Sequence, residues 1–77
     1  MHRLSELKRG QSAEVRTIHG EGDTVTRLYA LGLLPGARIE HVNTAPLGDP
    51  VAYRIEGQKI SMRRSDSAHV EIGEPHS

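Results

Sequence analysis

Residues 51–62, VAYRIEGQKISM, decide the fold class of this chain. Apolar residues alternate with polar or small ones before Gly57, and Ile60 and Met62 continue the alternation after it. A period of two is typical of a strand with one buried face. A glycine between two such runs is typical of a hairpin turn. The segment therefore predicts two antiparallel strands joined at Gly57.

Three more strands are expected outside this hairpin, because short runs of alternating residues recur between turn signals. In the first of them Ala13 and Val15 alternate with charged residues, and the pattern slips at Ile18, which indicates a β-bulge there. The five expected strands are residues 12–18, 37–44, 51–56, 59–63 and 69–72.

One short helix is expected between the first two strands, over residues 24–31. Its apolar residues recur at positions i, i+3 and i+6, which places them on one helical face. Asp23 is the expected N-cap, and Gly32 stands where a helix often ends with a positive φ. Two helical turns are marginal in isolation, so packing against the strands must hold this helix. Single turns are expected at residues 4–7 and 65–67.

Five strands and one inserted helix predict an all-β fold that closes as a small, partly open barrel. The pattern fits an SH3-like and an OB-like barrel equally well. We expect one domain over residues 1–77, with a core from 4 to 72 and a mobile tail from 73 to 77. Leu, Ile and Val make up only 17 of the 77 residues, and Phe is absent. So thin a core gains from further burial, which favours docking on a partner or formation of a homodimer.

The composition excludes several classes of protein. The absence of cysteine excludes a disulfide framework and a thiolate zinc site, and it favours the reducing cytosol. Ten basic residues balance ten acidic ones, whereas nucleic-acid-binding domains usually carry a basic surplus. We therefore interpret the basic stretch 59–64 as the solvated face of a strand. No apolar run approaches the length that spans a bilayer.

No pattern of catalytic residues is visible, so neither an enzyme nor a cofactor is expected. The serines lack a nucleophile-elbow setting, and no phosphate-binding loop with its lysine is present. His19, Glu21 and Asp23 alternate and could offer one nitrogen and two carboxylates to a metal ion. Two glycines lie between them, however, and ordering such a loop costs entropy. No metal site is therefore expected. His41 and His69 are expected to be partly buried barrel residues.

Apolar residues in turn and loop positions are more informative, because a polar loop has no need of them. Leu33, Leu34 and Pro35 follow the helix, and Leu47 lies in a loop rich in proline and glycine. Tyr29 lies on the helix, away from its apolar face. The four loop residues either plug the ends of the barrel or form an apolar patch that binds a partner. Tyr29 either leans on the surface or anchors the same interface. We adopt the second interpretation as the working hypothesis.

The chain resembles a known family, FeoA. Four segments carry the resemblance, in the same order and over nearly the whole chain: Leu4-Ser5-Glu6-Leu7 with Gly10, residues 28–36 (LYALGLLPG), residues 45–50 (APLGDP), and Ile60 with Met62-Arg63-Arg64. Two features depart from the family pattern. His41 replaces an aliphatic residue, and residues 24–26 are less basic than is typical.

The resemblance implies an SH3-like barrel in the bacterial cytosol that serves the FeoB ferrous-iron transporter as an accessory protein. Docking would then use Tyr29, Leu33, Leu34, Pro35 and Leu47. Two other roles stay open. One is a chaperone that binds Fe(II) directly, and the other is a stimulator of the transporter's GTPase with Arg27 as an arginine finger. A peptide-binding SH3 groove is disfavoured, because such grooves need more aromatic residues than two tyrosines.

Overall fold

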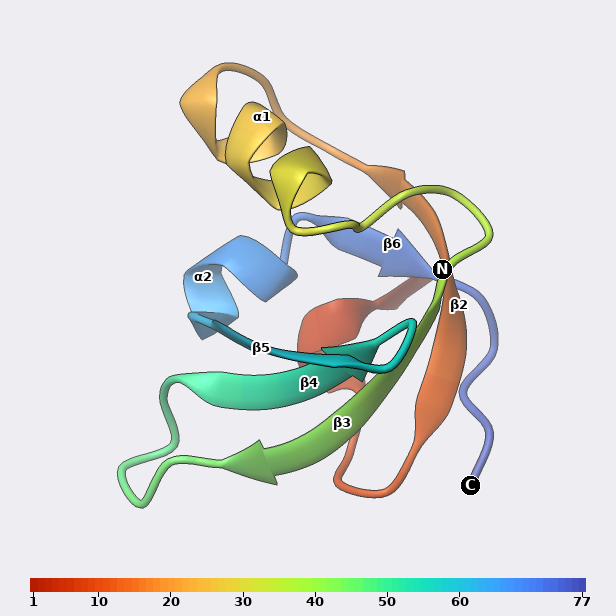
Figure 1. Ribbon diagram of the computed structural model, residues 1–77, viewed down its shortest axis with the longest axis vertical. Helices are drawn as coiled ribbons and strands as arrows, with labels where there is room; N and C mark the ends of the chain where they lie inside the picture. The colour runs from red at the N-terminus through yellow and green to blue at the C-terminus, as the bar shows by residue number, and fades with distance from the viewer.

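Six antiparallel strands form one curled sheet in the computed structural model, which describes residues 1–77 (Figure 1). The strands lie side by side in the order β1-β6-β2-β3-β4-β5. Their bounds are β1 (His2–Arg3), β2 (Ser12–Ile18), β3 (Arg38–Thr44), β4 (Val51–Ile55), β5 (Gln58–Met62) and β6 (Val70–Ile72). The helices are the 3₁₀ turn η1 (Leu4–Glu6), α1 (Asp23–Ala30) and α2 (Arg64–Ser67).

The all-β class with one inserted helix is confirmed, and every predicted strand is found within one residue of its expected bounds. The sheet has six strands rather than five, because β1 pairs with β6, His2 facing Ile72. A two-residue strand leaves no periodicity to detect. The turn expected at residues 65–67 is instead the single-turn helix α2.

The β4–β5 hairpin is held by a two-residue turn. Ile55 pairs with Gln58, and the residues between them, Glu56 and Gly57, have φ angles of 47° and 86°. Two consecutive positive φ angles define the turn whose twist matches that of the flanking strands. The turn predicted at Gly57 is confirmed.

Strand β2 occupies the centre of the sheet and has a different neighbour along each half. Its first half pairs with β3, Glu14 facing Arg38, and its second half pairs with β6, Ile18 facing Val70. The register shifts between Val15 and Thr17. The predicted bulge therefore exists, but its position at Ile18 was wrong. The extra residue lies earlier, and Ile18 is only the first buried side chain after it.

The helix α1 lies at one end of the barrel and buries Leu28 completely (Figure 1). Its N-cap is Gly22, with a φ of 79°, and no side chain caps it. The prediction of Asp23 as the N-cap was wrong, since Asp23 is already the first helical residue. Gly32 follows the helix with a φ of 97°, as expected. Neither α1 nor α2 has the length and apolar character that crossing a bilayer requires.

A single hydrophobic core fills the inside of the barrel that the curled sheet forms. Its 14 members are Leu4, Leu7, Ala13, Val15, Ile18, Leu28, Leu33, Ile39, Val51, Tyr53, Ile55, Met62, Val70 and Ile72. Two polar side chains, His41 and Ser67, are buried beside them. Both have hydrogen-bond partners, as buried polar groups generally do.

The tail after β6, which the sequence predicts to be mobile, lies along β2. The backbone N–H of His76 donates to the carbonyl of Ser12 at 2.8 Å, and the N–H of Ser12 donates back at 2.7 Å. Gly73 N–H donates to the Glu14 carbonyl at 2.8 Å. The tail therefore covers the edge of β2 that β6 leaves free.

Candidate functional site

Four of the five predicted docking residues lie on the surface. Leu47 is 97% exposed, Leu34 53% and Tyr29 39%, and Pro35 is exposed as well. Leu33 is fully buried in the core, so its assignment to the docking surface was wrong.

A tight turn after α1 separates Leu33 from Leu34. Leu33 N–H donates to the Leu28 carbonyl of the helix at 3.4 Å, whereas Leu34 N–H donates to the Gly32 carbonyl at 2.8 Å. The left-handed backbone at Gly32 redirects the chain between these two bonds. One leucine then points into the barrel and the next points out. Two adjacent leucines in the sequence carry no signal that tells them apart.

The exposed apolar residues form two separate surfaces. Tyr29, Leu34 and Pro35 lie at the C-terminal end of α1 and in the turn after it, and we call them the helix-end patch. Leu47 belongs to the β3–β4 loop, and this loop lies at the opposite end of the molecule from α1 (Figure 1).

The loop that carries Leu47 has internal order, and we call residues 45–50 the Leu47 loop. Ala45 N–H donates to the Pro50 carbonyl at 3.0 Å, and Gly48 N–H donates to the Ala45 carbonyl at 2.8 Å. These two bonds close the loop at its base and across its tip. Leu47 stands at that tip.

The three metal-ligand candidates do not come together. His19 Nε2 lies 2.7 Å from Glu71 Oε1 on β6, while Glu21 and Asp23 are exposed on the loop that leads into α1. Nowhere in residues 1–77 do three His, Cys, Asp or Glu side chains gather as metal ligands would. The three side chains alternate in the sequence but do not share one face of the loop, because Gly20 and Gly22 both take positive φ angles.

Arg27, the candidate arginine finger, is tied to α2. Its Nη2 lies 3.2 Å from both carboxylate oxygens of Asp66. This ion pair joins α1 to α2 beside a cleft of about 540 Å³. The cleft is lined by Arg27, Leu31, Pro50, Ser61, Met62, Arg63, Ser65 and Asp66.

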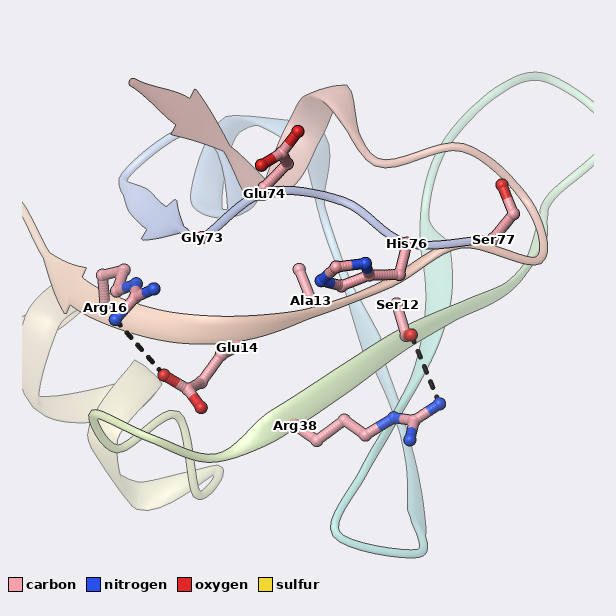
Figure 2. A pocket seen from close by; sticks show the side chains of 9 residues that line it. All are labelled: Ser12, Ala13, Glu14, Arg16, Arg38, Gly73, Glu74, His76 and Ser77. Carbon is pink, nitrogen blue, oxygen red and sulfur yellow. Dashed lines mark hydrogen bonds and ion pairs between the residues drawn. The ribbon is translucent and has the colours of Figure 1, made fainter.

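A second cleft, also of about 540 Å³, lies between β2 and the tail (Figure 2). Arg16 pairs with Glu14 at 3.3 Å, and Arg38 Nη2 donates to Ser12 Oγ at 3.3 Å. The Arg16 guanidinium lies over Gly73, where an added Cβ would come within 3.0 Å of Arg16 Nε. Opposite charges are mixed along this open groove, so it presents no single sign of charge to a ligand.

Arg64 is a residue whose role the sequence did not indicate. The sequence predicts that the basic stretch 59–64 is a solvated strand face, but Arg64 begins α2 and contacts the Leu47 loop. The two segments are far apart along the chain, and no periodicity or motif connects them. The contact is visible only in three dimensions.

Known proteins resemble this chain in both sequence and fold. The family model that describes the FeoA domain matches residues 2–73. The chain belongs to the FeoA family.

The FeoA relatives include a much longer protein. The Fe(2+) transport protein A/Fe(2+) transporter FeoB fusion protein of Porphyromonas gingivalis is 41% identical over 70 residues, which cover 91% of this chain. The same residues span 8% of the fusion protein. FeoA domains are thereby associated with ferrous iron transport.

Solved FeoA structures agree with the fold. The solution structure of FeoA from Chlorobium tepidum is 38% identical, covers 92% of this chain and 68% of its own, and has a TM-score of 0.84. FeoA from Stenotrophomonas maltophilia, solved in complex with zinc and described as an SH3 domain protein, is 26% identical with a TM-score of 0.83. That match covers 95% of this chain and 91% of the other. The SH3-like barrel implied by the resemblance is confirmed, which decides against the OB-like alternative.

Proposed function

We propose that this FeoA-family chain is a cytosolic accessory protein of bacterial ferrous iron uptake that docks on the cytosolic part of the FeoB transporter. The observation that carries the proposal is the fusion relative from Porphyromonas gingivalis, in which a FeoA-like domain and a FeoB transporter are one polypeptide. Fusion raises the effective concentration of one domain for the other. Two domains that act on each other gain from such an arrangement.

Exposed apolar side chains would supply the contact. The helix-end patch offers Tyr29, Leu34 and Pro35, and the other end of the barrel offers Leu47. Interface anchors are typically large apolar or aromatic residues that enter a desolvated pocket of the partner. The two surfaces lie at opposite ends of the barrel, so each is tested separately.

Docking can regulate the transporter only if the domain binds one transporter conformation better than another. Typical coupling energies of this kind are about 1–3 kcal/mol. An adaptor needs no catalytic group for this role. Its whole effect would come from differential binding.

Full-length FeoB in nanodiscs and surface-immobilised chain provide the test. Leu34→Asp should weaken binding about 30-fold or more if the helix-end patch is used, because truncating an anchor typically costs about 2 kcal/mol or more. Leu47→Asp tests the other surface in the same way. Gln58→Asp adds the same charge at an exposed position on β5 and is the matched control. Unchanged affinity for both leucine variants, with thermal unfolding like that of wild type, would exclude both surfaces.

The two alternative roles have less support from the geometry. A chaperone for Fe(II) needs converging ligands, whereas His19 is bonded to Glu71. A GTPase stimulator needs a free arginine, whereas Arg27 is bonded to Asp66. Anaerobic calorimetry with Fe(II), and GTP turnover by FeoB with and without this chain, separate these roles from docking alone.

A further inference from the structure

Arg64 holds the Leu47 loop from outside by two hydrogen bonds. Its Nε donates to the Gly48 carbonyl at 2.7 Å, and its backbone N–H donates to Asp49 Oδ1 at 2.9 Å. Hydrogen bonds that involve a charged partner are stronger than neutral ones, and each of these has one. The two residues that follow Leu47 are therefore fixed to the start of α2.

The same contacts complete the beginning of α2. The first N–H groups of a helix have no partner within the helix, and no side chain of the N-cap Arg63 supplies one. Asp49 does so from the Leu47 loop. The loop and the helix therefore stabilise each other, because Gly48 and Asp49, which follow Leu47, are both bonded to the first residue of α2.

Leu47 itself takes no part in this bracing. It is 97% exposed, while the backbone on both sides of it is bonded. An almost fully exposed leucine contributes nothing to the core. The four hydrogen bonds of this loop therefore do not serve to bury Leu47; they hold its backbone in place while the side chain stays in solvent. A rigid mounting does have a use in binding, because a group that is already ordered loses less entropy when it docks.

We propose that Arg64, assisted by Asp49, is a positioning residue that pre-organises Leu47 for insertion into an apolar pocket of the transporter. This inference rests on the proposed function and adds a residue that does not itself touch the partner. Arg64 acts through the loop. Its loss should therefore weaken docking only while Leu47 is present.

The bracing is tested first in the free protein. In Arg64→Ala, ¹⁵N relaxation should show order parameters at Leu47 and Gly48 falling from the rigid range near 0.85 to below about 0.6. Asp49→Ala should do the same, whereas Asp49→Asn, which keeps the accepting oxygen, should restore order. Arg63→Ala removes the neighbouring exposed arginine and is the control for charge. A loop that stays rigid in Arg64→Ala overturns the bracing, whatever the transporter does.

A double-mutant cycle then tests the link to docking. Binding of Arg64→Ala to FeoB in nanodiscs should be about two- to ten-fold weaker than that of wild type, the range that corresponds to ordering one side chain. In a Leu47→Ala background the same change should have no further effect. An equal loss in both backgrounds would show that Arg64 touches the partner itself and would overturn the proposal. If the Leu47 loop becomes mobile in Arg64→Ala but binding to FeoB is not weakened, the positioning role of Arg64 is overturned while the proposed docking stands. Wild-type chain that does not bind FeoB would instead refute the proposed function.

Discussion

The imidazole of His41 lies 5.5 Å from the ring of Tyr53, centroid to centroid, with the two planes at 52°. Both rings are buried. His41 Nδ1–H donates to the Leu7 carbonyl at 2.8 Å, and the Thr44 hydroxyl donates to Nε2 at 3.0 Å. The His41 side chain thus joins β3 to the segment after η1, and the Leu7 carbonyl, which can only accept, requires a proton on Nδ1.

Replacing His41 by leucine should destabilise the fold by about 1–3 kcal/mol, because the Leu7 carbonyl would stay buried without a donor. Urea unfolding followed by circular dichroism measures the change as a lower midpoint at constant slope. His2→Leu, at an exposed position, should shift stability by no more than about 0.5 kcal/mol. An unchanged midpoint for His41→Leu would show that water or a shifted backbone satisfies Leu7.

Leu33 and Leu34 form a matched pair for testing the turn after α1. Leu33→Ala should cost about 2–5 kcal/mol, since it leaves a cavity in the core. Leu34→Ala should change stability by no more than about 0.5 kcal/mol, because its side chain is exposed. Chemical unfolding of both variants is the measurement. Equal costs would mean that the two side chains do not face in opposite directions.

Tyr53 predicts a loss of stability in alkali. Burial raises the pKa of its hydroxyl, while the Ser67 hydrogen bond and the positive charge of Arg64 act in the opposite direction. Above the ordinary tyrosine pKa of about 10 the unfolded chain releases this proton and the folded chain keeps it. The unfolded state then binds fewer protons, so stability falls as pH rises from about 10 toward the raised pKa.

Tyr53→Phe separates this effect from other groups that titrate in alkali. Unfolding free energies measured at several values between about pH 8 and pH 11 should fall more steeply for wild type than for the variant. Parallel curves would show that the Tyr53 hydroxyl is ionised as easily in the folded state as in the unfolded chain.

Two glycines should respond differently to alanine. Gly32 has a φ of 97° and open space around it, so Gly32→Ala should cost about 1–2 kcal/mol from the backbone alone. Gly73 has no such φ, and its neighbour is the exposed end of Arg16, which can move. Gly73→Ala should stay within about 0.5 kcal/mol of wild type by thermal or urea unfolding. A large cost at Gly73 would mean that Arg16 is fixed against the tail.

Most of the sheet could be predicted because half-buried strands alternate visibly. The hairpin around Gly57 is an example, since its turn residues and its period of two both point to the same structure. The bulge was detected as a slip but misplaced, because the change of phase appears only at the next buried residue, Ile18. The strand β1 was missed, since its hydrogen bonds run to β6 and depend on no local pattern.

The candidate site was harder to predict, because exposure is decided by tertiary structure. Leu33 and Leu34 have the same chemistry and adjacent positions, and only the turn at Gly32 directs one inward. His19 faced Glu71 rather than its sequence neighbours. The contacts of Arg64 could not be predicted, since its partners in the Leu47 loop lie far away along the chain.

The position of β2 between β3 and β6 also constrains how the protein is made. Its second edge is satisfied only by residues close to the C-terminus, β6 and the tail after it, so a nascent chain still held in the ribosome at that point has an unpaired strand at its centre. Contacts this distant in sequence close slowly, on the millisecond-to-second scale for small barrels. The domain should therefore complete its sheet only after β6 has left the exit tunnel, and until then the open edge of β2 is the part of the chain most in need of a chaperone.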